Sequence, residues 1–410
     1  MNKHLFLLVM LGGILTTMAQ EKPTAKSMFE FCSNPLKYKT VEFVPEVLAA
    51  RTCGFIGNGF VTKQNETEVL ETFKNGNGKP TTPEWIASFT KSGDKYMASA
   101  EKEEKKKNTA TAKDDYEKAA FFYYMARWPH IFSPEAQQAY DKNVIAYKKA
   151  HQYEEVKFEE VKIPFEGKTI TGHLRTPNPN GKQPLVVICP GIDDWKGEVV
   201  EFNKAFLENG FATLIIDLPG TGEGEFHLTA GSYKIFSKAV EYAKDLPQID
   251  GDKIGFYGLS GGGHYAAAMA LYDKNIKASV NVGGPVHLSF SKEWLNFTPQ
   301  SIFMTLARCQ GLNPREIGKD NAIDKMGRLS LVEQGLINYK APTVPLLTIN
   351  GAKDVLASPD EYKVFDELGV NQDVLIFEND GHVAPAHFDI HIPFSVNWMK
   401  KSLGINTRHH

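Results

Sequence analysis

The stretch "GFYGLSGGGHYAAAMAL", residues 255–271, changes from strand-forming residues to a run of alanines, with a serine between glycines at the change. Gly258-Leu259-Ser260-Gly261-Gly262 fits the pattern G-x-S-x-G, in which the serine occupies a tight turn from a strand into a helix. Such a turn forces the serine to positive φ and leaves no room for side chains two positions away, which explains the glycines. Ser260 is therefore predicted to be a nucleophile, although the pentapeptide alone also suits a purely structural turn.

Apolar runs typical of buried strands surround this motif, with helical stretches between them. The runs are "PLVVICPG", "ATLIIDLPG", "KIGFYGLSG", "KASVNVGGP", "VPLLTING" and "DVLIFENDGH". Near-continuous apolar strands that alternate with helices indicate a mostly parallel central sheet with helices on both faces. Ahead of them, "VKFEEVKIPFEGKTITGHLRTP" alternates like an antiparallel hairpin with Glu166-Gly167 at its turn. Residues 287–340 form a long interval between two strands, which we interpret as a cap insertion.

The part of the chain before these strands is predicted to be mostly helical. Thr82-Pro83-Glu84 and Ser133-Pro134-Glu135 each place a capping hydroxyl before a proline, as helix starts do. We therefore divide the chain into a signal peptide, an N-terminal helical region, a catalytic α/β domain with its cap insertion, and a short tail. These parts are residues 1–19, 20–155, 156–404 with the cap at 287–340, and 405–410.

The N-terminus "MNKHLFLLVMLGGILTTMAQ" is typical of a secretory signal peptide. Lys3 precedes an apolar run over residues 5–15, and small residues follow at Thr17 and Ala19. The run is shorter than the roughly 20 helical residues that span a bilayer, so retention as a membrane anchor is the weaker alternative. We expect cleavage after Ala19 and a secreted or periplasmic protein.

Composition and motifs predict neither a nucleic-acid partner nor a cofactor or metal. The formal net charge of −3 provides no basic surface for nucleic acid. The motifs HExxH and CxxC are absent, and "PGTGEGE", residues 219–225, lacks the spacing of a dinucleotide-binding loop. The four cysteines, Cys32, Cys53, Cys189 and Cys309, are too scattered for a zinc site. Cys32 and Cys53 could pair in an exported chain, but their spacing leaves this open.

A serine nucleophile needs a base, and the base needs a carboxylate that holds its tautomer. In a sheet of this type the expected chain order is serine, acid, histidine. Asp354 follows the strand "VPLLTING" and His382 follows "DVLIFENDG", so both are expected at the same sheet edge as Ser260. The alternatives are Asp360 and Asp380 for the acid and His264, His387 and His391 for the base, all of which suit structural positions better.

Two backbone amides are also expected to stabilise an oxyanion. One is the amide of Gly261, directly after the serine, and the other is that of Ile192 in the loop after "PLVVICPG". In the same loop, "GIDDWKGE" contains Asp193 and Lys196. These two side chains either contact the substrate or brace the loop, and the residues alone do not decide between these alternatives.

The chain also resembles a known group of enzymes. "CPGIDDWKGE", "DLPGTGEGE", "YGLSGGG", "GAKD" and "DGHVAPA", preceded by "YEKAAFFYYMARWPHIFSPEAQQAYDKNVIAYKKA", are similar to the α/β-hydrolases that include the fermentation–respiration switch protein, 2,6-dihydroxypseudooxynicotine hydrolase and fungal polyketide-shortening hydrolases. The resemblance extends from about residue 80 to the end. It implies an α/β-hydrolase fold, a lid made by the N-terminal helical region, and a triad of Ser260, Asp354 and His382. The signal peptide departs from these largely intracellular relatives.

Three functional hypotheses follow, and the expected partner of the enzyme is a small-molecule substrate. The first is an exported serine hydrolase that cleaves a carboxylic ester through an acyl-enzyme. The second, which the resemblance implies, is retro-Claisen cleavage of a carbon–carbon bond in a β-diketone-type substrate with the same triad. The third is a non-catalytic binding protein on a hydrolase scaffold, and a peptidase is a further alternative. No stable membrane anchor is expected, and a homodimer is left open.

Overall fold

A computed structural model describes residues 22–49, 51–337, 344–367, 370 and 372–405 of the chain. Its centre is an eight-stranded sheet with the order β10-β9-β8-β7-β5-β6-β4-β3. All neighbouring pairs from β10 to β6 are parallel, whereas β4 pairs antiparallel with both β6 and β3. The strands are β3 (Lys157–Phe165), β4 (Lys168–Thr176), β5 (Gln183–Cys189), β6 (Ala212–Ile216), β7 (Ile249–Leu259), β8 (Ala278–Val282), β9 (Leu346–Gly351) and β10 (Gln372–Phe377).

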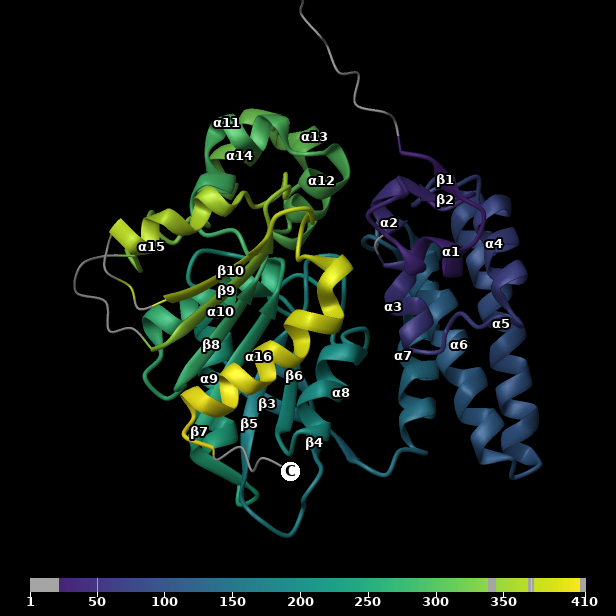
Figure 1. Cartoon of the computed structure of the whole chain (residues 1–410), viewed down its shortest axis with the longest axis horizontal. Helices are drawn as coiled ribbons and strands as arrows, with labels where there is room; N and C mark the ends of the chain where they lie inside the picture. Colours follow the sequence, from purple (N-terminus) through teal and green to yellow (C-terminus); the bar gives the residue numbers. More distant parts are fainter. Residues whose placement is uncertain (1–21, 50, 338–343, 368–369, 371, 406–410) are drawn as a thin grey trace, which may run out of the picture.

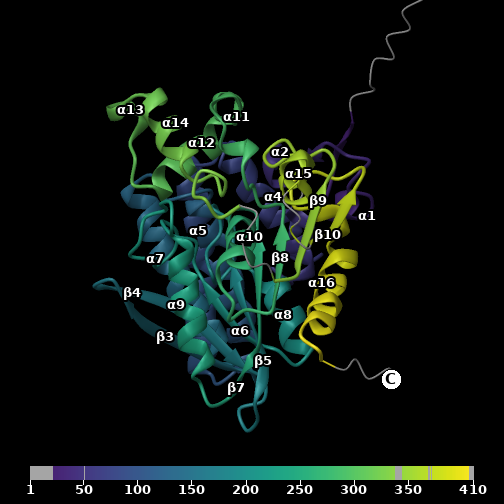
Figure 2. The same cartoon turned by 90° about the vertical axis from the view of Figure 1, so that its left-hand side faces the viewer.

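Helices cover both faces of this sheet, as Figures 1 and 2 show. On one face α8 (Val200–Glu208) and α16 (Phe388–Ser402) pack against side chains of the central strands. On the other face α9 (Tyr233–Lys244) and α10 (Gly261–Tyr272) bury the alternate side chains of the same strands. Because successive strand residues point to opposite faces, strands buried on both sides must be apolar throughout. The predicted mostly parallel sheet with helices on both faces is confirmed.

The N-terminal helices form a separate layer beside the sheet, on the right in Figure 1. They have an aromatic core of their own, in which Phe73, Trp85, Phe89 and Phe122 are buried. Both sequence-predicted helix starts are present, since the hydroxyls of Thr82 and Ser133 accept hydrogen bonds from backbone amides of the first turn. The elements of this layer are β1 (Thr24–Ala25), α1 (Met28–Ser33), β2 (Thr40–Val41), α2 (Glu46–Ala49), α3 (Thr52–Gly57), α4 (Glu66–Asn75), α5 (Pro83–Lys105), α6 (Thr109–Arg127) and α7 (Pro134–His151).

A disulfide joins Cys32 in α1 to Cys53 in α3. The sequence left this pairing open, because the separation of two cysteines along a chain does not determine whether the fold brings them together. The other two cysteines, Cys189 and Cys309, are free thiols buried in the sheet part. Burial raises the pKa of both thiols, that of Cys309 to about 12, so neither is a reactive thiolate.

The described part of the long interval between β8 and β9 contains four helices at the carboxyl end of the sheet (Figures 1 and 2). Phe303, Ala322 and Ile323 belong to their small core. The helices are α11 (Lys292–Phe297), α12 (Gln300–Cys309), α13 (Pro314–Ile317) and α14 (Lys319–Gly327). They occupy most of the predicted insertion 287–340, of which residues 338–340 lie outside the described residues.

The remaining elements follow β8, β9 and β10 along the chain. They are α15 (Lys363–Glu367) and three short 3₁₀ turns, η1 (Leu288–Phe290), η2 (Pro359–Tyr362) and η3 (Pro385–His387). Within the described ranges, we find no helix that is long and apolar enough to cross a membrane. The predicted signal peptide, residues 1–19, lies outside these ranges, as does the tail apart from Ile405.

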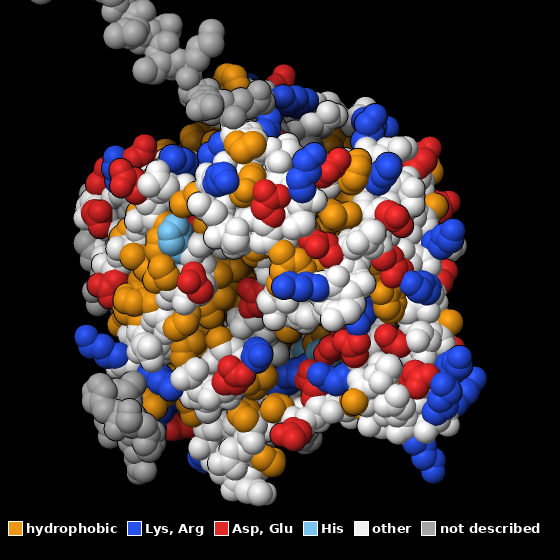
Figure 3. Space-filling model, turned by 45° about the vertical axis from the view of Figure 1, so that its right-hand side comes forward, with side chains coloured by type: hydrophobic (Ala, Val, Ile, Leu, Met, Phe, Trp, Pro, Cys, Tyr) orange, Lys and Arg blue, Asp and Glu red, His pale blue; other side chains and the backbone are white. Residues whose placement is uncertain are grey.

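Hydrophobic and charged side chains are unevenly distributed over the face drawn in Figure 3. In Figure 3 hydrophobic side chains gather on the left half of the face, whereas charged side chains predominate at the lower right. Among the exposed large hydrophobic residues are Val374 on β10 and Ile390 and Phe394 on α16.

Candidate active site

Ser260 lies on the sharp turn between β7 and α10. Its φ is +53°, in the left-handed region that residues with a Cβ rarely adopt. The neighbouring glycines are required by close backbone contacts. A Cβ at Gly258 would lie 2.0 Å from the carbonyl oxygen of Gly262, and one at Gly262 would lie 2.0 Å from that of Cys189. The structure thus supplies the steric reason that the sequence pattern predicted for these glycines.

His382 and Asp354 lie next to this serine although they come from later loops. Nδ1 of His382 is 2.8 Å from Oδ2 of Asp354, and Nε2 of His382 is 2.8 Å from Oγ of Ser260. An ionised carboxylate only accepts hydrogen bonds, so Nδ1 carries the hydrogen and Nε2 presents its lone pair to the serine hydroxyl. The three sequence-predicted residues therefore form one continuous hydrogen-bonded relay, in the arrangement in which histidine acts as the base for a serine.

Asp354 is held as a carboxylate in a buried position. Burial by itself would raise its pKa, but the positive charge that His382 has when protonated and hydrogen bonds from His382, Asn350 and the Leu356 amide together hold the pKa below its usual value. The Asn350 amide donates to Oδ2 at 2.8 Å, and the Leu356 amide donates to Oδ1 at 2.7 Å. Because Oδ2 also accepts from His382, both oxygens are oriented and the carboxylate cannot turn away from the histidine.

The alternative acids lie elsewhere. Asp360 is on η2 and forms an ion pair with Lys363 at 2.6 Å. Asp380 precedes His382 closely, but its Oδ2 contacts Nδ1 of His387 at 2.9 Å. Of the five alternatives that the sequence offered, these two acids and His387 are therefore engaged in pairs that exclude His382.

The two other alternative histidines are buried. His264 lies one turn after Ser260, and its Nδ1 donates to the carbonyl oxygen of Pro285 at 2.9 Å. Burial lowers the pKa of His264 to about 4, and the same cause lowers the pKa of His391 to about 4. Both are therefore neutral at physiological pH, and His264 also lines the cavity around Ser260.

The loop after β5 lies close to the serine. A Cβ at Gly191 would lie 3.4 Å from the Cβ of Ser260, and one at Gly261 would lie 3.4 Å from the backbone nitrogen of Ile192. The amides of Gly261 and Ile192, which the sequence suggested as oxyanion donors, therefore belong to segments that touch each other beside Ser260. This closeness makes it geometrically reasonable for both amides to reach one oxygen.

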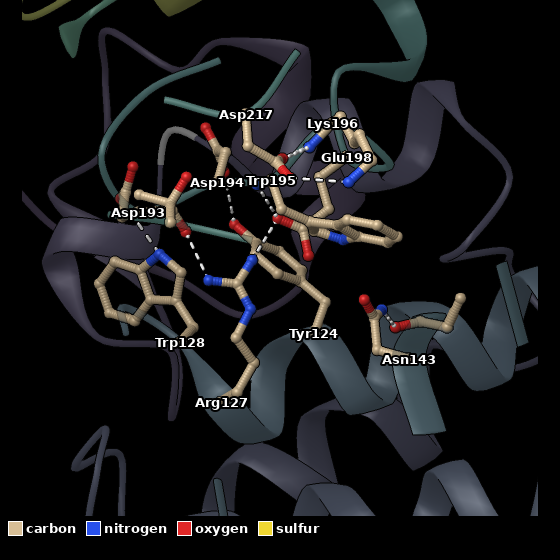
Figure 4. A network of polar contacts seen from close by, with 12 residues as sticks. Tyr124, Arg127, Trp128, Asn143, Asp193, Asp194, Trp195, Lys196, Glu198 and Asp217 are labelled. Atoms are coloured by element: carbon tan, nitrogen blue, oxygen red, sulfur yellow. Dashed lines mark hydrogen bonds and ion pairs between the residues drawn. The ribbon is translucent and has the colours of Figure 1, made fainter. Parts of the chain in front are cut away.

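Asp193 and Lys196 behave differently from each other. Lys196 has no exposed surface, and its amino group is 2.7 Å from both Asp217 and Glu223, which favours the bracing alternative for this residue. Asp193 lines the cavity, but its Oδ2 accepts hydrogen bonds from Arg51 at 2.6 Å and from the Trp128 indole at 3.1 Å. Figure 4 shows Asp193 facing Trp128, with Lys196 and Asp217 together at a distance from this pair.

Ser260 and His382 line a cavity of about 520 Å³, within the usual range for a small-molecule site. Its wall is built from all three parts of the chain. Phe55 and Phe121 come from the N-terminal helices, Ser260 and His382 from the sheet part, and Leu306 from the inserted helices. The wall is mainly apolar, so a substrate would be held largely by its hydrophobic surface.

One group of side chains within the described ranges has the spacing of a metal site. The ligand atoms of Glu160, His173 and Glu223 all lie within 4.8 Å of one another. Two lysines already neutralise these carboxylates, because Lys148 lies 2.5 Å from Glu160 and Lys196 lies 2.7 Å from Glu223. A metal ion would have to displace both ammonium groups, so the group is better explained as an internal ion-pair network.

Sequence reasoning missed several residues that hold this site together. Asn350 orients Asp354 through its amide and accepts hydrogen bonds from the Gly351 and Val383 amides through its oxygen. The only sequence feature that could have indicated a role for Asn350 is its position near the end of β9, in "TING". Arg51 and Arg127 carried no signal, because they lie in the N-terminal part, far along the chain from the loop that they contact.

The topology and the relay together define an α/β-hydrolase, and solved structures agree. The crystal structure of 2,6-dihydroxy-pseudo-oxynicotine hydrolase superposes with a TM-score of 0.70 over 81% of this chain and 92% of that chain, at 19% identity. A structure titled AbyA5 Wildtype superposes with a TM-score of 0.67 over 84% and 95%, at 18% identity. Likeness at these identities shows the fold alone.

The chain belongs to the FrsA-like esterase family, whose profile, described as "Esterase FrsA-like", matches residues 62–403. Esterase FrsA of Photobacterium profundum is 24% identical over 295 residues, which cover 70% of this chain and 68% of the relative. Esterase FrsA of Escherichia coli O157:H7 is 25% identical over 292 residues, covering 70% and 69%. The resemblance inferred from the sequence is thus confirmed, and the family supports assignment as a hydrolase.

Proposed function

We propose that this protein is an exported serine hydrolase that cleaves a carboxylic ester. The observation that carries the proposal is the relay from Ser260 through His382 to Asp354, with 2.8 Å at each of its two contacts. Membership of an esterase family supports the ester bond as the target. The mainly apolar cavity favours an ester whose acyl or alcohol part is hydrophobic.

In this proposal the serine hydroxyl attacks the ester carbonyl while Nε2 of His382 takes its proton. Asp354 stabilises the imidazolium that forms, and the amides of Gly261 and Ile192 donate to the oxyanion. His382 then returns the proton to the leaving alcohol, which breaks the carbon–oxygen bond and leaves Ser260 acylated. Water, deprotonated by the same histidine, hydrolyses the acyl-enzyme and restores the serine.

Two features support export. The residues up to Ala19 have the pattern of a cleavable signal peptide. Cys32 and Cys53 form a disulfide, and disulfides persist mainly in oxidising compartments such as the periplasm and the extracellular space.

The first test is labelling with a fluorophosphonate probe, followed by a panel of p-nitrophenyl esters of increasing acyl length. Ser260→Ala is expected to abolish labelling and to reduce turnover by about 10⁴- to 10⁶-fold. Ser289→Ala is the matched control, because Ser289 lines the same cavity but donates its hydroxyl to the Leu356 carbonyl. Folded wild-type protein that is not labelled would argue for a binding protein and against this function.

The panel should also contain β-diketones. Turnover of a β-diketone with none of any ester would replace ester hydrolysis by carbon–carbon bond cleavage as the activity of the same relay. Both reactions begin with attack on a carbonyl, so labelling of Ser260 is expected in either case and the panel alone separates them.

A further inference from the structure

The loop that carries Ile192 presents an electrostatic problem for the proposed chemistry. Asp193 and Asp194 follow Ile192 directly and are only 9% and 6% exposed. Two carboxylates with little access to water lie within one or two residues of the amide that would bind an oxyanion. Negative charge that develops on the substrate would be repelled by them, and low solvent access strengthens this repulsion.

Arg51 offsets part of the negative charge of this pair of acids. Its guanidinium contacts Oδ2 of Asp193 and Oδ1 of Asp194, each at 2.6 Å, so that it bridges both carboxylates. Arg51 also donates to the hydroxyl of Tyr124 at 2.7 Å. The planar fork of arginine suits such a bridge, because its N–H groups point in fixed directions toward separate acceptors.

The second arginine nearby, Arg127, has different hydrogen-bond partners from Arg51. Arg127 donates to the backbone oxygen of Asp193 at 3.0 Å and forms an ion pair with Glu198. Figure 4 shows Arg127 between Asp193 and Glu198, with Tyr124 beside Asp194. Arg127 therefore already has Glu198 as its ion-pair partner, and Arg51 is the cation that contacts the side chains of both aspartates.

Arg51 comes from a segment that the family profile does not cover. The match begins at residue 62, whereas Arg51 immediately precedes α3 and lies two residues before Cys53. The disulfide from Cys53 to Cys32 ties this position to α1. Phe55 from the same segment lines the cavity together with Arg51. Residues 22–49 and 51–61, here called the N-terminal clamp, thus reach the catalytic loop directly.

We propose that Arg51 is a positioning residue for hydrolysis, which holds the loop carrying the Ile192 amide and offsets one negative charge of the Asp193 and Asp194 pair beside the oxyanion. The inference rests on the proposed serine hydrolase function. It adds that the N-terminal clamp, outside the family's matched region, completes the active site.

Charge balance predicts a distinctive pH dependence. The groups that face the two aspartates are Arg51, Tyr124 and Arg127, with Glu198 paired to Arg127. Burial raises the pKa of Asp194, and the charge of Arg51 opposes this rise. Without Arg51, Asp194 should therefore keep its proton to a higher pH and ionise as the pH rises. The rate deficit of an Arg51 variant relative to wild type should grow with pH.

The test compares Arg51→Met, Arg51→Lys and the double variant Arg51→Met/Asp193→Asn by the rate of fluorophosphonate labelling and by ester kcat and KM between pH 6 and 9. Arg51→Met should lose about 10²- to 10³-fold in labelling rate and kcat, the usual effect of losing one oxyanion donor. Arg51→Lys keeps the charge and should lose less than about tenfold. The double variant should recover at least about tenfold over Arg51→Met, because it removes one of the repelling charges. Arg315→Met, an exposed residue of α13, is the matched control.

The outcomes separate this inference from the proposed function. An unreactive wild type would overturn the function and the inference with it. A reactive wild type whose Arg51→Met variant labels within about threefold would overturn the inference alone, as would a deficit that does not change with pH and is not relieved by Asp193→Asn. If Arg51→Met fails to fold, Arg51→Lys and the charge-balanced double variant carry the comparison.

Discussion

Asp354→Asn gives the sharpest test of the relay, because the geometry determines what the amide can do. In the wild type, Oδ2 accepts from His382 and Asn350 and Oδ1 accepts from the Leu356 amide. An asparagine offers one oxygen and one NH₂ group, and either orientation points the NH₂ group at an existing N–H donor. If it faces His382, the imidazole is forced into the tautomer with hydrogen on Nε2, which cannot accept the Ser260 proton.

If the amide turns the other way, the correct tautomer survives but loses its neighbouring negative charge. In both cases the imidazolium formed during attack on the substrate is destabilised. We expect kcat to fall by about 10³- to 10⁴-fold, which corresponds to about 4 to 5.5 kcal/mol at 1.36 kcal/mol for each tenfold change. The assay is steady-state hydrolysis of the best p-nitrophenyl ester, with thermal unfolding measured alongside to show that the variant is folded.

Asp380→Asn is the matched control for this experiment. Asp380 is also a buried aspartate next to a histidine, but it contacts His387 and not His382. It is expected to keep kcat within about tenfold of wild type, since its carboxylate orients the turn after β10 and not the base. A folded Asp354→Asn protein with wild-type kcat, or an equal loss in both variants, would refute the assignment of Asp354 as the acid.

Three further predictions concern stability. Because burial lowers the pKa of folded His391 to about 4, the unfolded chain binds the extra proton as the pH falls from about 6.5 to 4, and the free energy of unfolding should fall over this window. The difference in unfolding free energy between pH 7 and pH 4.5, measured by denaturant titration, should be smaller in His391→Leu than in the wild type by up to about 3 kcal/mol. An equal difference in both proteins would contradict this prediction. Replacing Cys32 and Cys53 by serine should destabilise the protein by about 3 kcal/mol, and reductant should lower the wild-type melting temperature but not that of the variant. Lys196→Met leaves buried Asp217 without its cation and should cost about 3 to 5 kcal/mol in unfolding free energy; a changed KM in a protein of normal stability would instead indicate substrate contact.

Local patterns in the sequence are enough to predict the fold class and to narrow the reactive residues to a short set of alternatives. The glycines around Ser260 reflect contacts within a few residues of the turn, and apolar runs reflect strands buried on both faces. The order of serine, acid and histidine then follows from the parallel sheet, since the carboxyl ends of parallel strands share one edge.

Which of these alternatives meet depends on the tertiary structure. Asp354 and Asp380 both follow strands, and the relay to His382 is distinguished from the pair with His387 only by the path of the loops. The Cys32–Cys53 disulfide and the bridge from Arg51 to the aspartates likewise join segments that are distant along the chain. That distance does not indicate whether the segments are in contact. Local sequence patterns predict turns and buried strands, because these depend on steric contacts and burial within a few residues. Long-range charge pairing depends on where the packed helices and sheet place each side chain.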